Sequence, residues 1–315
     1  MKIVFIGTPE FGAIILEGLM QGNFKPILVV TAPDKPVGRK QILTPPPVKI
    51  VAEKYEIPVL QPEKIENLRP KIEDLKPDLI IVVACAQILS KEILKIPKYG
   101  CLNVHPSLLP IYRGCSPIQY AILNGDKETG VTTIRMDEKI DHGDIVAVSK
   151  FQIKNPEITL KELSKELASL GTELLIKTIP QWITGEIKPR PQDDSKAIYT
   201  KIIRKKDGKI DWKKSAEELE RQIRAFDPWP GSYCLWSKNS KNLRIKILEA
   251  FVLPQKNYGP FGIRGKTFLA PDSKIAVQAG KDYLIIGKLQ LEGGKPVSSE
   301  EFLRGYPNFI GKILE

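Results

Sequence analysis

The chain contains 315 residues, of which 42% are hydrophobic and 27% charged, a composition typical of an ordinary globular protein. It has no apolar run near the roughly 20 residues that a membrane-crossing helix needs, and its start, MKIVFIGTPEFG, lacks the apolar stretch and cleavage site of a signal peptide. We therefore expect a cytoplasmic protein without membrane contacts. The four cysteines lack paired spacing, so the sequence predicts neither a disulfide framework nor a metal site.

The net charge of +11 is distributed unevenly along the chain. From residue 190 onward there are 24 Lys and Arg against 15 Asp and Glu, whereas the first 189 residues hold 24 against 22. A basic final third predicts a polyanionic partner, with nucleic acid favoured. The alternative is a lysine-rich solubilising surface, which would not explain why the charge is segregated.

The first half of the chain alternates apolar strands with helices. A helix is expected from about Glu10 to Met20, and buried strands at 2–7, 26–31, 78–84 and 100–105. Apolar strands separated by helices predict an α/β fold with a Rossmann-like, mostly parallel sheet that is covered on both faces. Segments 130–136 and 144–153 are predicted to form a hairpin, followed by an amphipathic helix over 159–179.

The pattern changes after residue 184. Segment 190–208 is proline-rich and charged, which is typical of a linker. A short helix follows, with Ser215 and Glu218 as its capping box, and then short strands between turn residues predict a small antiparallel barrel or sandwich. We therefore expect a first domain at 1–189, a linker at 190–208 and a β-rich domain at 209–315. Trp229, between this helix and the strands, is predicted to belong to the core.

Polar residues at one end of the predicted sheet suggest a catalytic site. His105 ends the strand at 100–105, and Asn103 leaves the same face two residues earlier. Ligands of open parallel sheets bind at the carboxyl ends of the strands. Asp141 follows the strand at 130–136 in a loop that could return to this edge, although Asp-x-Gly-Asp alone is more often a turn. A carboxylate beside an imidazole fixes its orientation and favours its charged form.

Asparagine can donate to a developing oxyanion, and histidine can do the same or transfer a proton. Together with Asp141, these groups suit direct attack of an external nucleophile on a carbonyl carbon, through a tetrahedral intermediate. Ser107 and Cys115 lack an obvious partner base, so neither is the expected nucleophile. The turn GTPEFG at 7–12 lacks the glycine pattern of dinucleotide-binding proteins, which disfavours a nicotinamide-dependent dehydrogenase.

The stretch NVHPSLLPIYRGCSPIQYAILNGDKETGVTTIRMDEKIDHGDI resembles the signature of the folate-dependent formyltransferases, in which Asn-x-His precedes Asp-x-Gly-Asp. The whole chain is similar to the members of this family that act on initiator methionyl-tRNA, through segments such as TAPDKPVGRKQILTPPPVK and LERQIRAFDPWPGS. The resemblance implies formyl transfer from 10-formyltetrahydrofolate to the α-amino group of methionine on that tRNA. It also implies a formyltransferase catalytic domain at 1–189 and an OB-like β-barrel that binds tRNA at 209–315. Asn103, His105 and Asp141 match the catalytic residues of the family. We expect a monomer that uses no metal.

The resemblance also implies which residues bind the two substrates. The folate-binding residues implied are Gln87, Ile88, Leu89, Ser107, Leu108, Leu109, Pro110, Asp137, Glu138, Lys139 and Ile140. The implied tRNA-binding residues are Arg39 and Lys40, in a basic loop at 34–47, together with Lys205, Lys206 and Lys209 as phosphate contacts. The pair Cys85-Ala86 departs from the family, which usually has an aromatic residue and a glycine there.

Other functions remain open at this stage. The same catalytic set would serve a formyltransferase for a small amine or a sugar nucleotide, or a 10-formyltetrahydrofolate hydrolase that uses water as the acceptor. An RNA-binding protein with an inactive enzyme fold is a further alternative, which the intact Asn103, His105 and Asp141 disfavour. The basic final third and the Arg39 loop favour tRNA over small acceptors.

Overall fold

The computed structural model describes residues 1–315 apart from 39, 239, 256–261 and 271. Within it the chain forms two compact units. The first comprises Met1–Pro117, Lys127–Lys154 and Glu162–Lys201, and the second comprises Ile118–Asp126, Asn155–Lys161 and Ile202–Glu315. In the described part of the chain, no helix combines the length and apolar character that crossing a membrane requires.

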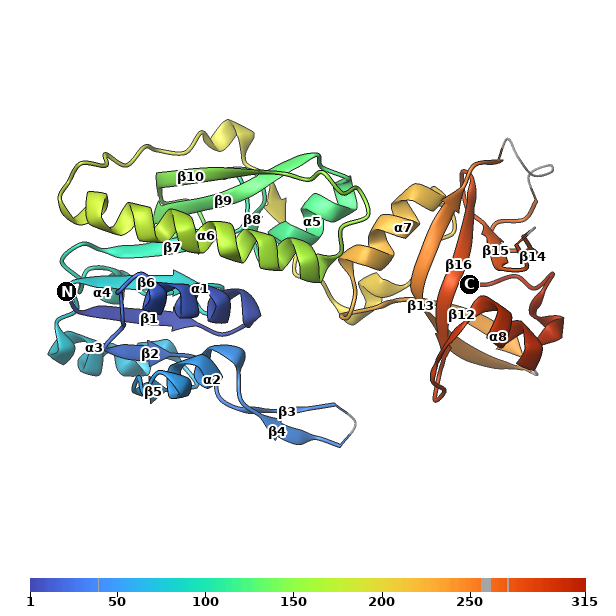
Figure 1. The fold of residues 1–315 in the computed structure, drawn as a ribbon, viewed down its shortest axis with the longest axis horizontal. Helices are drawn as coiled ribbons and strands as arrows, with labels where there is room; N and C mark the ends of the chain where they lie inside the picture. The colour runs from blue at the N-terminus through green and yellow to red at the C-terminus, as the bar shows by residue number, and fades with distance from the viewer. Residues whose placement is uncertain (39, 239, 256–261, 271) are drawn as a thin grey trace. The chain divides into compact units, whose positions relative to one another are not determined.

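A seven-stranded sheet forms the centre of the first unit (Figure 1). Its strands, in spatial order, are β10 (Asp144–Gln152), β9 (Glu128–Arg135), β7 (Cys101–His105), β6 (Leu79–Val83), β1 (Ile3–Gly7), β2 (Leu28–Val30) and β5 (Val59–Leu60). The five strands from β7 to β5 are parallel, whereas β9 and β10 form an antiparallel hairpin at the other edge. The predicted mostly parallel sheet and the predicted hairpin are confirmed.

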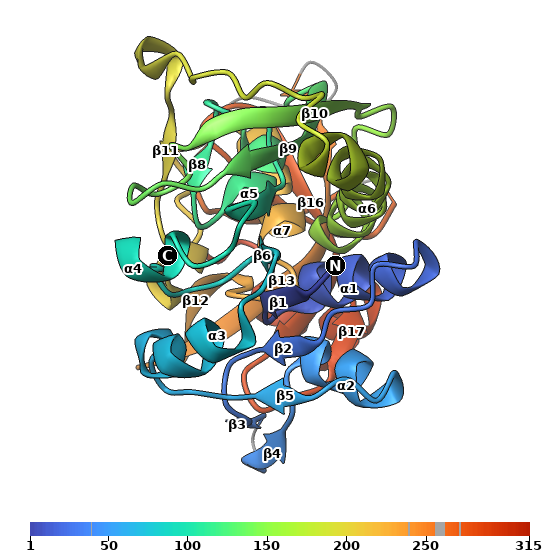
Figure 2. The ribbon, with the colours of Figure 1, turned by 90° about the vertical axis from the view of Figure 1, so that its left-hand side faces the viewer.

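Helices cover both faces of this sheet. Figure 2 shows α1 (Glu10–Gln21), α2 (Pro47–Lys54) and α6 (Leu160–Ile183) on one face, with α3 (Arg69–Leu75) and α4 (Lys91–Leu94) on the other. Gly171 allows α6 to approach the strands, because a Cβ at this position would lie 3.1 Å from Val104 and 3.3 Å from Val131. Strands β1, β2, β6 and β7 are therefore buried on both faces, which explains why they are largely apolar.

The strand order reverses between β1 and β6. The chain builds outward from β1 through β2 to β5, then returns to the other side of β1 with β6 and β7. The loops that follow β1 and β6 therefore leave the sheet in opposite directions. Ligands of open α/β sheets bind in the crevice between such loops, at the carboxyl ends of the strands. Strand β6 ends at Val83 and β7 ends at His105. The candidate site lies at this position.

Two short ribbons complete the first unit. Strands β3 (Lys35–Val37) and β4 (Ile42–Thr44) form an antiparallel hairpin, and β8 (Arg113–Gly114) pairs in parallel with β11 (Tyr199–Thr200). Arg190 exchanges two backbone hydrogen bonds with Ile145. Residues 190–200 therefore follow the first unit closely through backbone pairing.

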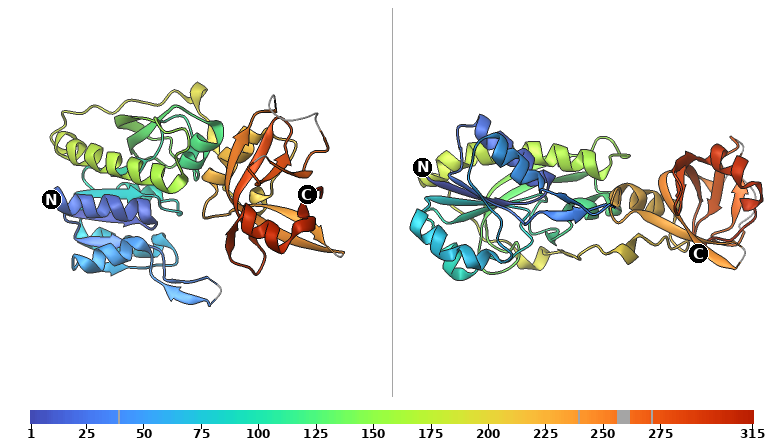
Figure 3. Two further views of the ribbon diagram at one scale, coloured as in Figure 1. Left: turned by 45° about the vertical axis from the view of Figure 1, so that its right-hand side comes forward. Right: turned by 90° about the horizontal axis from the view of Figure 1, so that it is seen from below.

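The second unit is an antiparallel sheet with helices. Its strands are β12 (Ser232–Lys238), β13 (Lys241–Leu253), β16 (Tyr283–Leu291), β15 (Ile275–Gln278), β14 (Thr267–Leu269) and, paired with β16, β17 (Pro296–Ser298). Backbone hydrogen bonds join Glu315 to Leu235 in β12 and Leu314 to Gly265 before β14, so the C-terminal residues link the two edge strands. Figure 3 shows these strands in orange and red. The antiparallel sheet agrees with the sequence analysis, and the linked edges are consistent with a barrel.

In the part of the chain that the structure describes, three α-helices accompany these strands: α5 (Pro117–Asn124), of which all but the first residue belong to this unit, α7 (Ala216–Ala225) and α8 (Ser299–Gly305). The predicted capping box of α7 is confirmed, since Ser215 and Glu218 each bind the backbone of the other. The prediction for Trp229 is wrong, because its side chain is 57% exposed. Trp236, which packs edge-on against Phe309, occupies the aromatic core instead.

Candidate active site

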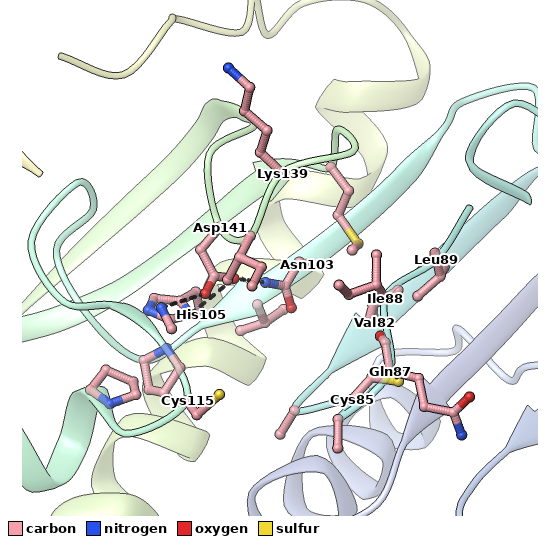
Figure 4. A pocket seen from close by; sticks show the side chains of 18 of the residues that line it. Val82, Cys85, Gln87, Ile88, Leu89, Asn103, His105, Cys115, Lys139 and Asp141 are labelled. Carbon is pink, nitrogen blue, oxygen red and sulfur yellow. Dashed lines mark hydrogen bonds and ion pairs between the residues drawn. The ribbon is translucent and has the colours of Figure 1, made fainter. Parts of the chain in front are cut away.

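A cavity of about 400 Å³ lies at the carboxyl ends of β6 and β7, within the first unit. Its walls come from residues 84–89 after β6, from the end of β7 with residues 114–117, and from residues 136–141 between β9 and β10. Figure 4 shows Asn103, His105 and Asp141 together, with Ile88 and Leu89 further along the cavity. The three predicted catalytic residues thus share one polar end of a largely apolar cavity.

Asp141 contacts both of the other candidate catalytic residues. Its Oδ1 accepts a hydrogen bond of 3.2 Å from Asn103 Nδ2 and lies 3.5 Å from His105 Nδ1. Its Oδ2 accepts a hydrogen bond of 2.8 Å from the backbone N–H of Gly114. The side chains of His105 and Asp141 are only 5% and 15% exposed, so these contacts are largely shielded from water.

The backbone fixes the tautomer of His105. Its Nε2 lies 2.9 Å from the carbonyl oxygen of Tyr112, and a carbonyl oxygen can only accept, so Nε2 carries a proton. In the neutral ring, Nδ1 is then the unprotonated atom, and it faces Asp141. Tyr112 has a φ of 63°, a left-handed conformation that is uncommon for a residue with a side chain. Nδ1 is therefore the atom that can gain and release a proton toward the cavity.

Two residues that the sequence analysis missed hold the backbone around Asp141. Gln192 Nε2 donates hydrogen bonds of 2.8 Å to the carbonyl oxygens of Asp141 and Gly143. Arg113, with a side chain only 1% exposed, donates to the carbonyl oxygen of the same Gln192 side chain. No motif connects these residues, because Gln192 lies in a segment that the sequence analysis assigned to a linker.

The residues implied in folate binding fall into two groups. Those that line the cavity are Gln87, Ile88, Leu89, Asp137, Glu138, Lys139 and Ile140. The side chain of Gln87 turns away, since its Oε1 accepts from the Ile65 N–H and its Nε2 donates to the Glu63 carbonyl. Ile88 and Ile140 are 70% and 51% exposed, so two large apolar side chains face open space in the cavity.

The second group, Ser107, Leu108, Leu109 and Pro110, is not part of the cavity lining in the part of the chain that the structure describes. Ser107 is fully buried and its hydroxyl donates to the carbonyl oxygen of Ile111. The backbone N–H of Leu109 donates to Thr132 Oγ1. These contacts shape the loop that returns the Tyr112 carbonyl to His105.

The residues implied in tRNA binding are surface residues where the structure describes them. Lys40 lies between β3 and β4, and Lys205, Lys206 and Lys209 lie in or beside a 3₁₀ turn at Lys205–Gly208; all four are exposed. Arg39 lies outside the described residues. The β3–β4 hairpin also exposes Val37, Ile42 and Leu43, so cationic and apolar side chains occur together on it.

Two cysteines also line the cavity, and they differ in environment. Cys115 is exposed, whereas burial raises the pKa of the Cys85 thiol. Among the described residues, no group of three or more histidine, cysteine, aspartate or glutamate side chains could hold a metal ion.

Comparison with known proteins shows that the chain belongs to the formyl transferase family of enzymes. The family model described as "Formyl transferase" matches residues 1–179, and the model for the formyl transferase C-terminal domain matches residues 202–307. The methionyl-tRNA formyltransferase of Citrifermentans bemidjiense is 43% identical over 317 residues, which covers 100% of this chain and 96% of the relative. That of Caldicellulosiruptor saccharolyticus is also 43% identical, and the match covers both chains completely.

Solved structures show the same fold. The N-formyltransferase from Helicobacter canadensis, in complex with folinic acid and dTDP-3-aminofucose, matches with a TM-score of 0.64 and 24% identity over 91% of this chain and 98% of that one. HypX from Aquifex aeolicus, in complex with tetrahydrofolic acid, also has a TM-score of 0.64, with 17% identity over 98% of this chain and 48% of HypX. The formyltransferase fold expected from the sequence is therefore confirmed.

Proposed function

We propose that this enzyme transfers the formyl group of 10-formyltetrahydrofolate to the α-amino group of methionine on initiator tRNA. The observation that carries the proposal is the meeting of Asn103, His105 and Asp141 at one end of the cavity, in a chain 43% identical to named methionyl-tRNA formyltransferases over its full length. A folate-derived formyl donor also agrees with solved structures of the same fold that contain tetrahydrofolic acid or folinic acid.

In the proposed reaction, the amine nitrogen attacks the formyl carbon, and the carbonyl oxygen becomes an oxyanion. Asn103 is suited to stabilise it, because Nδ2 has two N–H groups and only one is used by Asp141. Donors that are already oriented in a shielded site stabilise developing charge without reorganisation at the moment of reaction. The bond between the formyl carbon and N10 of the folate then breaks, which releases tetrahydrofolate and the formylated amine.

The reaction also moves a proton from the attacking amine to N10 of the departing folate. His105 Nδ1 and the Asp141 carboxylate are the candidate carriers, and they lie 3.5 Å apart at the cavity. The Tyr112 carbonyl keeps the Nε2 proton in place, so the exchange is confined to Nδ1. In this proposal Asp141 stabilises the imidazolium that forms while the proton is held.

The remainder of the cavity would hold the ring system of the folate. Its volume of about 400 Å³ lies within the range of roughly 300–1,000 Å³ that is typical of small-molecule sites. Ile88 and Ile140 would lose their exposure against a flat ring, and backbone groups of 84–89 and 137–141 would supply its hydrogen bonds. Ser107 to Pro110 would act indirectly, through the loop that positions His105.

The tRNA would bind through basic side chains. Lys205, Lys206 and Lys209 are exposed and would contact phosphates, which position an RNA without reading its bases. Arg39 and Lys40 would contact the acceptor end that carries the methionine. The excess of positive charge from residue 190 onward supports a polyanionic substrate and a salt-dependent affinity.

The test is a transfer assay with formyl-labelled 10-formyltetrahydrofolate and three conditions: methionine-charged initiator tRNA, methionine-charged elongator tRNA, and no acceptor. Label on the initiator methionine alone supports the proposal. Release of labelled formate at the same rate in all three conditions would instead identify a hydrolase and would contradict it.

A further inference from the structure

The side-chain amide of Gln192 makes four hydrogen bonds. Its two N–H groups donate to the carbonyl oxygens of Asp141 and Gly143, each at 2.8 Å. Its oxygen accepts from Arg113 Nε at 3.0 Å and from Arg113 Nη2 at 2.8 Å. An amide has two donors and two acceptor lone pairs, so its capacity is fully used and its orientation is fixed.

Arg113 holds this amide from a rigid position. Its Nη1 donates to the hydroxyl of Tyr199 at 3.0 Å, and its Nη2 donates to Asp194 Oδ1 at 2.8 Å. Burial lowers the pKa of Arg113, whereas its hydrogen bonds to Tyr199 and Asp194 raise it. The hydrogen bonds have the larger combined effect, so the pKa of Arg113 lies above its usual value. A charged guanidinium with four of its five N–H groups engaged gives Gln192 a fixed anchor.

The loop that Gln192 holds is not in a relaxed conformation. Asp141 has a φ of 49°, in the left-handed region that costs a residue with a side chain of the order of 1 kcal/mol. At Gly143, a Cβ would lie only 2.0 Å from the carbonyl oxygen of Arg135, so the backbone is pressed against β9. Such a conformation persists only where surrounding contacts impose it.

We propose that Gln192 is a positioning residue for catalysis, which the buried Arg113 orients and which holds the carboxylate of Asp141 against Asn103 and His105. The inference rests on the proposed formyl transfer and extends it. Gln192 thereby supplies the contact that sets the position of the Asp141 backbone. Gln192 itself contacts no reacting group in this account.

The proposal predicts a particular defect for Gln192→Glu. The new carboxylate keeps two acceptors for Arg113, but it has no N–H to donate to the carbonyls of Asp141 and Gly143, and it repels both. Misplacing a catalytic group lowers turnover more than substrate affinity, so we expect kcat to fall at least ~10-fold while both KM values stay within ~3-fold. Ser195→Glu is the matched control, because it adds the same charge to the same exposed segment without touching the loop.

A double-mutant cycle separates positioning from general stability. If Gln192 acts through Asp141, then Gln192→Glu changes kcat by less than ~3-fold once Asp141→Asn is present, because the two residues serve one function. Fully multiplicative losses in the double variant, or a kcat for Gln192→Glu within ~2-fold of wild type, would overturn the proposal. If thermal melting shows that Gln192→Glu is unfolded, Gln192→Ala is used in its place. The site of Gln192 is half-buried, so water can replace the missing side chain there.

The same experiment distinguishes failure of the proposed function from failure of the positioning role. Wild-type protein that released formate without formylating any methionyl-tRNA would contradict formyl transfer to tRNA, whatever the variants did. Wild-type protein that formylated the tRNA, together with unaffected Gln192 variants, would contradict only the positioning role.

Discussion

Replacement of Asp141 by asparagine tests the arrangement of the candidate site most directly. The carboxylate accepts from Asn103 Nδ2 at 3.2 Å and from the Gly114 N–H at 2.8 Å, and it faces His105 Nδ1 at 3.5 Å. An asparagine side chain of the same shape has only one oxygen. If that oxygen accepts from Gly114, its N–H groups point at the N–H groups of Asn103; if it accepts from Asn103, they point at the Gly114 N–H.

The size of the effect follows from the contacts that are lost. One hydrogen bond to a charged group is worth about 1.5–3 kcal/mol, and the stabilisation of an imidazolium at His105 disappears together with the charge. At about 1.4 kcal/mol for each tenfold change in rate, a combined loss of roughly 3–4 kcal/mol predicts a fall in kcat of about 10²–10³. The side chain of Asp141 is only 15% exposed, so solvent compensates little.

The assay is single-turnover formylation of methionine-charged initiator tRNA at saturating 10-formyltetrahydrofolate, together with a folate-binding measurement. Asp144→Asn is the matched control from the same Asp-x-Gly-Asp motif. Asp144 contacts the exposed Arg135 at 2.7 Å, so we expect wild-type turnover for this variant. A kcat for Asp141→Asn within ~3-fold of wild type, in a folded protein, would refute the role that we assign to the carboxylate.

Four further outcomes are expected. His105→Ala should lower kcat at least ~10²-fold with little change in tRNA affinity, and unchanged turnover would contradict proton transfer at Nδ1. Ile88→Asp should weaken folate binding about 10-fold, since roughly half of an isoleucine side chain's burial energy is lost, and an unchanged Kd by titration would place the ring elsewhere. Arg39→Ala should impair transfer to tRNA while the folate Kd is unchanged; equal weakening of both would assign the loop to the folate. A thiol reagent at pH 8 should label exposed Cys115, and the folate should protect it, whereas Cys101, whose pKa burial raises to about 12, should stay unlabelled until unfolding.

The sequence predicted the features that depend on neighbouring residues. Continuous apolar runs indicated the parallel strands, and strand periodicity placed Asn103 and His105 on one face at a carboxyl end, as β7 shows. The spacing of Ser215 and Glu218 predicted the start of α7. Each of these patterns reflects backbone geometry over a few residues, so a single chain segment contains the information.

Those local patterns could not predict features that depend on contacts between distant segments. Trp229 has a large apolar side chain, which is typical of a core residue. Its position in the short turn between α7 and β12 leaves it exposed, and Trp236 occupies the core instead. The sequence placed Ser107 in the family signature, but it could not show that this side chain is buried and that its hydroxyl donates to the carbonyl oxygen of Ile111.

By itself, the sequence determined the fold class, the family signature and the three polar side chains of the site. Only the tertiary structure decided how those side chains are held: the Tyr112 carbonyl on His105, and Gln192 with Arg113 behind Asp141. The physical reason is that hydrogen-bond partners separated by tens of residues leave no periodic trace in the chain. Their pairing is set by where the folded backbone places a donor beside an acceptor.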